Sequence, residues 1–152
     1  MRGQVLIIAT LACVAIHATL IHAQVCEDDE SFSTEFRENL LPAQTGDPQA
    51  QLFVGYLYET GQGVEQNFVK AAQWYQKSAE QGNALAQLQL GTMYINGKGV
   101  PQNFVLAYLW LDLASAQGNI SARNRLEALA KQMGPARVAE AKRLAVQWKA
   151  KK

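Results

Sequence analysis

The chain has 152 residues, of which 49% are hydrophobic and 18% are charged, and its formal net charge is +1. This composition is ordinary for a globular protein. The length allows one domain with a substantial core and excludes a second domain of similar size. Acidic residues gather between positions 24 and 59 and basic residues between 123 and 152, which we interpret as two solvated faces.

The first 23 residues differ from the rest of the chain and have the pattern of a signal peptide. Arg2 is their only charged residue, and the stretch 5–23 is mostly apolar. It ends in Ala23, a small residue of the kind that precedes a cleavage site. We therefore expect an exported protein, periplasmic or secreted. An uncleaved anchor, and with it membrane contact, is the alternative, because the apolar stretch approaches the length that spans a bilayer.

Cleavage after Ala23 would change the chemistry available to the mature chain. It would remove both histidines, His17 and His22, and also Cys13. Cys26 would then be the single thiol, so it could not form an internal disulfide. We interpret Cys26 as a bystander, although a disulfide between two copies would be a route to self-association.

An acidic segment, 24–45, precedes the central part of the chain. Phe32 and Phe36 belong to a short apolar stripe before Pro42, which predicts a short helix over that stretch. Phe32 lies 36 residues before Phe68, which holds a fixed place in the pattern that follows. We interpret the stripe as a degenerate second helix of a repeat that caps the N-terminal end.

The centre of the chain repeats with a period of 36 residues. A shift of 36 residues aligns Gly46 with Gly82 and Gly82 with Gly118. Between the segments 46–81 and 82–117, 16 of the 36 positions are identical. Self-similarity at such a period is typical of solenoids built from stacked supersecondary units. We therefore predict two successive repeats.

Each repeat is predicted to contain two helices joined by a glycine turn. Asp47 can cap the first helix, with Pro48 at its opening position. Gly61 supplies the left-handed conformation that ends a helix, and Asn67 caps the second helix. The predicted helices span about 48–59 and 68–81 in the first repeat and about 83–96 and 104–117 in the second.

The last segment, 118–152, is predicted to contain a partial repeat and a closing helix. A first helix starts at Asn119 and is broken by Gly134 and Pro135. The closing helix carries an apolar stripe at spacings of three and four, made of Val138, Ala141, Leu144, Ala145 and Trp148. We expect this stripe to cover the end of the array, because a terminal repeat cannot bury its own apolar face.

Residues shared by the two repeats have packing roles that require no binding function. Gly55 and Ala71 are small enough to let neighbouring helices approach, while Tyr58 and Trp74 fill the enclosed space. We expect replacement of Trp74 or Trp110 by alanine to cost about 3–5 kcal/mol of stability.

The chain twice shows the pattern A-Q-x-x-x-G-x-x-Y-x-x-G-x-G-V-x-x-N-F-x-x-A-x-x-W, at positions 50–74 and 86–110. This pattern resembles the Sel-1-like repeat (SLR), a relative of the tetratricopeptide repeat. The resemblance implies an all-α fold, a right-handed α/α solenoid of two full repeats with N- and C-terminal capping helices. It also implies an adaptor that binds a protein or peptide through a concave surface lined by the first helix of each pair.

If that surface carries over, partner contacts should come from first-helix positions that vary between the repeats. These are Gln49, Phe53, Tyr56 and Thr60 in the first repeat, and Leu85, Gln89, Thr92 and Asn96 in the second. Spacings of three and four place each set on one helix face. Aromatic, amide and hydroxyl groups together suit peptide recognition. Alternatively, Phe53 and Tyr56 pack against the N-terminal cap helix.

An enzyme is the competing class of function. Cysteine-rich exported SLR relatives have been linked to penicillin binding and β-lactamase activity, but they carry a cysteine pair in each repeat, and this chain carries none. The cleaved chain would also lack histidine, and no serine begins an S-x-x-K motif. We therefore predict no catalysis, no cofactor or metal and no nucleic-acid partner. A penicillin-interacting hydrolase is kept as the alternative.

Overall fold

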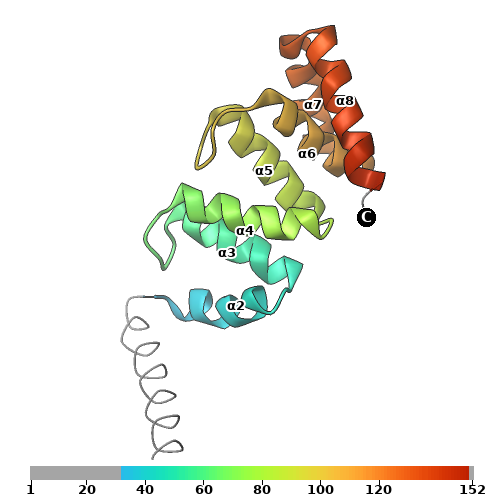
Figure 1. The fold of residues 1–152 in the computed structure, drawn as a ribbon. Helices are drawn as coiled ribbons and strands as arrows, with labels where there is room; N and C mark the ends of the chain where they lie inside the picture. The colour runs from blue at the N-terminus through green and yellow to red at the C-terminus, as the bar shows by residue number, and fades with distance from the viewer. Residues whose placement is uncertain (1–31, 151–152) are drawn as a thin grey trace, which may run out of the picture.

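The computed structural model describes residues 32–150, which form seven helices and no strand (Figure 1). The helices are α2 (Thr34–Gln44), α3 (Pro48–Thr60), α4 (Phe68–Glu80), α5 (Ala84–Asn96), α6 (Phe104–Ala116), α7 (Ile120–Met133) and α8 (Pro135–Ala150). The predicted signal peptide, Cys26 and the start of the acidic segment lie outside the described residues. Between residues 32 and 150, no helix has both the length and the apolar character needed to cross a membrane.

The helices pack as consecutive pairs that stack into an array. α3 packs on α4, α5 packs on α6, and α4 joins the two pairs by packing on α5 (Figure 1). α2 covers the N-terminal end of the array, while α7 and α8 close the other end. The predicted all-α solenoid with two repeats and capping helices is confirmed.

Capping groups start and stop the first helix of each repeat where the sequence predicts. The Asp47 carboxylate accepts hydrogen bonds from two backbone N–H groups of α3, at 2.7 and 2.9 Å. Asn83 caps α5 in the same way, at 3.0 and 3.1 Å. Gly61 and Gly97 follow these helices with φ of 74° and 67°, a left-handed conformation that glycine adopts without a steric penalty.

The repeated Gln-Asn-Phe run holds the loop between the two helices of each repeat. The Gln66 side chain and the Asn67 backbone N–H each donate to a carbonyl near the end of α3, both at 2.8 Å. Gln102 and Asn103 make the same two bonds to α5, at 2.7 and 3.0 Å. These bonds satisfy carbonyls that a helix end leaves without partners, so the run has a structural role.

A pair of glutamines ties each repeat to the helix before it. The Gln51 amide donates to the carbonyl of Ala43 at 3.0 Å and accepts from Gln81 at 2.7 Å. Gln87 and Gln117 form the equivalent side-chain bond at 2.8 Å. Gln51 and Gln87 are almost fully buried, so each needs these partners in place of water. Internal hydrogen bonding therefore accounts for these identical positions.

Glycines in the first helices allow the second helices to approach closely. A Cβ atom on Gly55 would lie 2.7 Å from Cδ1 of Tyr75, and one on Gly91 would lie 2.9 Å from Cγ of Leu111. Neither glycine has a positive φ, so the requirement is for space and not for backbone freedom. The close contact at Gly55 places the Tyr75 ring against α3.

α2 docks on the first repeat as a second helix would. The Ser33 backbone N–H donates to the carbonyl of Gly63 at 2.8 Å. Phe36 is almost fully buried and meets Tyr58 edge to face, with ring centroids 5.3 Å apart. These contacts confirm that the segment before the first repeat forms an N-terminal cap.

The cap helix is longer than the sequence indicates, because α2 continues through Pro42 to Gln44. Proline removes one backbone hydrogen bond from a helix interior and disturbs the preceding turn. Pro42 is exposed, whereas Ala43 is buried and its carbonyl is bonded to Gln51. Packing of the last turn on α3 therefore outweighs the local cost of the proline.

The C-terminal cap follows the predicted stripe. Gly134 and Pro135 separate α7 from α8, and Ala141 and Ala145 of α8 are buried. Trp148 meets Trp110 of α6 edge to face, with ring centroids 5.0 Å apart and planes at 70°. α8 therefore covers the apolar face that the second repeat would otherwise expose.

The two repeat tryptophans do not share the core role that the sequence assigns to both. Trp110 is 4% exposed, whereas Trp74 is half-buried at the edge of the core. Lys77 covers Trp74, with its Nζ 4.2 Å from the ring centroid. In the first repeat Tyr75 is the fully buried aromatic of α4, because Gly55 leaves space for its ring. The expectation for Trp74 is therefore corrected.

Candidate functional site

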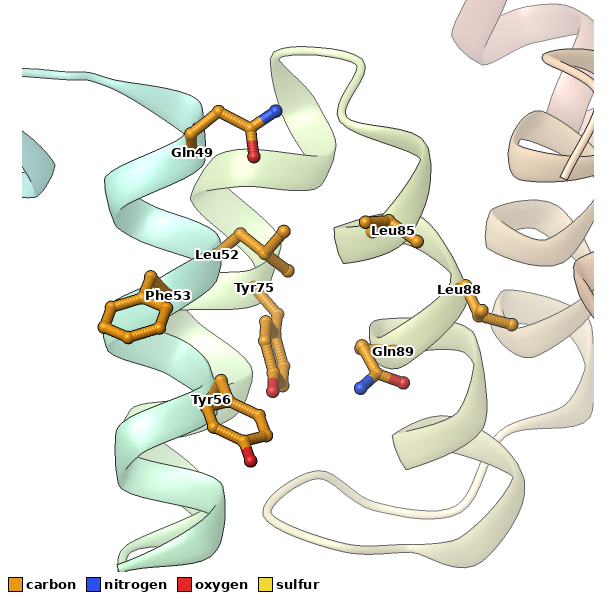
Figure 2. Close-up of a pocket in the computed structure, with 8 residues that line it drawn as sticks. All are labelled: Gln49, Leu52, Phe53, Tyr56, Tyr75, Leu85, Leu88 and Gln89. Carbon is orange, nitrogen blue, oxygen red and sulfur yellow. The ribbon is translucent and has the colours of Figure 1, made fainter. Parts of the chain in front are cut away.

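A groove opens between α3 and α5, with Tyr75 of α4 between them (Figure 2). Its volume of about 420 Å³ lies within the range of small-ligand pockets. The residues that line it are Gln49, Leu52, Phe53, Tyr56, Tyr75, Leu85, Leu88 and Gln89. Aliphatic and aromatic side chains dominate, and each of the two first helices contributes one amide.

Five of the eight positions predicted for partner contact meet in this groove: Gln49, Phe53, Tyr56, Leu85 and Gln89. The other three do not line it. Thr60 and Thr92 donate their hydroxyls to carbonyls one turn earlier in their own helices, at 2.9 and 2.8 Å. Asn96 is exposed at the end of α5. A partner-binding role for all eight stays a prediction.

Three of the lining residues were not predicted from the sequence. Leu52 and Leu88 are identical between the repeats, so a rule that favours variable first-helix positions excludes them. Tyr75 was missed because it belongs to a second helix. Its counterpart is Leu111, so variation between the second helices was the signal that could have found it.

Tyr56 and Phe53 form the aromatic side of the groove. Their rings stack with centroids 6.3 Å apart and planes at 29°. Tyr56 is 39% exposed, and Phe53 is half-buried against the core. The N-terminal cap helix therefore does not bury Tyr56, and both rings remain part of the groove wall.

Tyr75 lies fully buried beneath the groove walls, and its hydroxyl is bonded within the fold. Its hydroxyl donates to a Glu59 carboxylate oxygen at 2.6 Å. Burial, reinforced by the hydrogen bond and the charge of Glu59, raises the pKa of Tyr75 far above the ordinary value for a tyrosine, and a hydrogen bond from Gln89 opposes this in part. Tyr75 is therefore neutral and fixed in orientation across the physiological pH range.

The groove presents uncharged chemistry to a ligand. Its two amides can each donate and accept hydrogen bonds, which matches the N–H and C=O groups of a peptide backbone. Across residues 32–150 there is no group of three or more His, Cys, Asp or Glu residues placed to hold a metal ion. The arrangement suits apolar and hydrogen-bonding contacts.

Comparisons with known proteins identify the repeat. The family model described as Sel1 repeat matches residues 48–83 and 84–119, the same period displaced by two residues from the units chosen on glycines. The solved structure of a Sel1 repeat protein from Oxalobacter formigenes is 38% identical, with a TM-score of 0.60 over 60% of this chain and 69% of that one. The chain belongs to the Sel1 repeat family.

A second solved Sel1-like structure extends the comparison. It is a protective antigen of uropathogenic Escherichia coli strains that displays an SLR fold, 33% identical with a TM-score of 0.70. The alignment covers 74% of this Sel1 repeat chain and only 24% of the antigen. No functionally curated protein matched. Neither structure is described as a hydrolase, so the penicillin-interacting alternative gains no support.

Proposed function

We propose that this Sel1 repeat protein is an exported scaffold that binds a peptide segment of a partner protein in the groove between α3 and α5. Sel1 repeats generally mediate protein–protein interaction. The observation that carries the proposal is that side chains which differ between the repeats keep exposed surface at the groove, beside the identical Leu52 and Leu88 that also line it. Gln51 and Asn67 are occupied by hydrogen bonds within the fold, whereas Tyr56 and Leu85 keep exposed surface at the groove.

The groove is suited to one apolar side chain flanked by peptide backbone. Leu52 from α3 and Leu85 from α5 approach the groove from its two sides, and Tyr75 lies between the two helices (Figure 2). Leu85 is 53% exposed, so a partner that covers it removes apolar surface from water. Gln49 and Gln89 can then pair with the backbone on either side of the inserted group.

The export part of the proposal rests on the apolar stretch 5–23 that follows Arg2. It is tested by mass spectrometry of the protein purified from the cell envelope or medium. A mature N-terminus at Gln24 is the expected result. Retention of Met1 in all of the protein would contradict cleavage and favour the membrane-anchored alternative.

The groove is tested with a matched pair of substitutions, Leu85→Glu and Val69→Glu. Both residues occupy the second position of a helix and are similarly exposed, at 53% and 54%, but only Leu85 lines the groove. Partners are captured from the same cell fraction with wild-type protein and then titrated against both variants.

We expect Leu85→Glu to weaken the captured partner's affinity by about tenfold or more, because a charge would be buried at the contact. Val69→Glu should bind as wild type. Both variants should keep the wild-type circular dichroism and melting temperature. Equal binding by the two correctly folded variants would contradict the groove as the partner site.

A further inference from the structure

A second hollow, the turn pocket, continues the groove past the N-terminal ends of α3 and α5. Its volume is about 430 Å³, and it shares Gln49 and Leu85 with the groove. The rest of its lining consists of Pro48, the turn at 81–84 and Gln117 at the end of α6. The groove and the turn pocket therefore form one continuous path, which runs from between the first helices onto the turn between α4 and α5.

The groove is bounded at its opposite end. In Figure 2, Gln49 and Leu85 lie toward one end of the groove and Tyr56 lies toward the other. The Gln62 side chain donates to the Tyr56 hydroxyl at 3.4 Å, so the loop after α3 lies against that end. A peptide held in the groove would therefore continue through the end that opens into the turn pocket.

Two glutamines that line the turn pocket have a fixed amide orientation. Each donates its Nε2 to the buried glutamine of its own repeat, at 2.7 Å for Gln81 and at 2.8 Å for Gln117. Within residues 32–150, no donor is bonded to the Oε1 atom of either side chain. An amide oxygen held in this way can accept a hydrogen bond from a peptide N–H. The turn pocket thus offers the same backbone pairing as Gln49 offers in the groove.

The path is uncharged along its whole length, because none of the described residues that line the groove or the turn pocket carries a charge. Asp47 and Glu80 are next to lining residues in the sequence, but both already accept hydrogen bonds within the fold. A charged group that entered the path would lose water without gaining an opposite charge. This chemistry favours an uncharged occupant.

We propose that the partner segment is an uncharged, extended peptide, with an apolar side chain in the groove and its backbone continuing across the turn pocket. This inference rests on the proposed function, because it extends the peptide site between α3 and α5. The shared lining residues and the two glutamine oxygens favour a continuous backbone over an isolated small ligand.

The test is a nuclear magnetic resonance titration of the protein as cells process it. The probes are acetyl-Gln-Leu-Gln-amide, acetyl-Glu-Leu-Glu-amide, acetyl-Lys-Leu-Lys-amide and N-acetyl-leucine amide, which has no flanking residues. We expect all four to shift the methyl signals of Leu85.

Only the glutamine-flanked peptide should also shift the side-chain amide signals of Gln81 and Gln117. Because it gains hydrogen bonds in the turn pocket, it should bind about threefold to tenfold more tightly than N-acetyl-leucine amide. The two charged peptides should bind no more tightly than N-acetyl-leucine amide.

Ala84→Glu and Ile120→Glu test the path at equivalent helix positions. Both residues begin a first helix, where a carboxylate is compatible with the helix dipole, but only Ala84 lines the turn pocket. Ala84→Glu should lower the affinity of the glutamine-flanked peptide to that of N-acetyl-leucine amide, whose own binding should not change. Ile120→Glu should bind both probes as wild type does. The wild-type shifts test the path even if a variant folds poorly.

The outcomes separate this inference from the groove itself. Shifts at Leu85 without tighter binding of the glutamine-flanked peptide would overturn the path across the turn pocket and leave the groove proposal standing. Binding of either charged peptide as tightly as the glutamine-flanked one would overturn the uncharged occupant. If no probe shifts the Leu85 signals, both proposals are contradicted.

Discussion

The two repeats have the same scaffold but different cores in their second helices. Identical caps, loops and glutamine bonds hold both units together. In the first repeat α4 buries Tyr75, which is bonded to Glu59, and leaves Trp74 half-exposed. The second repeat has Leu111 at the position of Tyr75 and buries Trp110.

The residues that the two repeats share have a different role from the residues in which the repeats differ. The shared residues satisfy helix ends and set the spacing between helices, which every unit of the array needs. The substituted positions change the chemistry that the groove presents. The groove beside Tyr75 combines both kinds of position, because Leu52 and Leu88 are identical in the repeats whereas Phe53 and Gln89 are not.

The largest expected difference between the repeats is at their tryptophans. Trp110→Ala should lower the free energy of unfolding by about 3–5 kcal/mol, because a buried indole leaves a cavity. Trp74→Ala should cost less than half as much, since its ring is half-buried. Urea unfolding followed by circular dichroism measures both values. Equal losses would show that the two positions are equivalent after all.

A smaller difference is expected within the glycine loops. A Cβ on Gly99 would lie 2.0 Å from the carbonyl oxygen of Phe68, and φ there is +68°. Gly97→Ala is the matched control, because its φ is +67° but its nearest neighbour, a Gln102 side-chain atom, is at 3.5 Å. We expect a loss of roughly 1–2 kcal/mol for Gly97→Ala from strain alone.

Gly99→Ala should cost roughly 1–2 kcal/mol more than Gly97→Ala, because backbone atoms cannot move aside as a flexible side chain can. In the first repeat, a Cβ on Gly63 would meet the side chain of Ser33 first, and not backbone atoms. Gly63→Ala should therefore fall between the other two variants in thermal unfolding. A Gly99→Ala loss no greater than that of Gly97→Ala would contradict this contact.

The smallest effect concerns Tyr75. Tyr75→Phe removes the hydrogen bond to Glu59 and should cost about 1 kcal/mol at neutral pH. Folding raises the pKa of Tyr75, so Tyr75 contributes to the free energy of unfolding in a pH-dependent way. This contribution is complete below the unfolded pKa of about 10 and is lost as the pH rises above that value. The unfolded chain then releases a proton that the folded chain retains.

The measurement is urea unfolding of both proteins at a series of pH values from 8 to 11. Wild-type stability should fall more steeply than that of Tyr75→Phe above about pH 10. Burial also raises the pKa of Tyr94 and Tyr108. The free energy of unfolding of Tyr75→Phe should therefore still fall with pH, although less steeply. Identical slopes would contradict the coupling of Tyr75 to the fold.

Local signals in the sequence were sufficient to predict the helices and their order along the chain. Asp47 and Asn83 cap their helices through short-range hydrogen bonds, and Gly61 and Gly97 end them through backbone conformation. Both mechanisms act within a few residues, so they are visible in sequence spacing. The length of α2 was not predicted, because its passage through Pro42 depends on packing against α3.

The groove could be predicted only in part. Helix periodicity correctly grouped Phe53 with Tyr56 and placed Leu85 with Gln89, because it describes one face of one helix. It could not show which part of that face borders the groove, so the predicted set also contains Thr60, Thr92 and Asn96, which do not line it.

The sequence by itself determined the period, the helix ends, the caps and the positions free to vary, because those depend on neighbours along the chain. Tertiary structure alone decided that Tyr75 fills the space at Gly55 and that Trp110, not Trp74, is buried. Burial is a property of surfaces brought together from distant segments, and identical residues in two repeats meet different neighbours. The physical reason is that each repeat packs against something different, α2 on one side and α8 on the other.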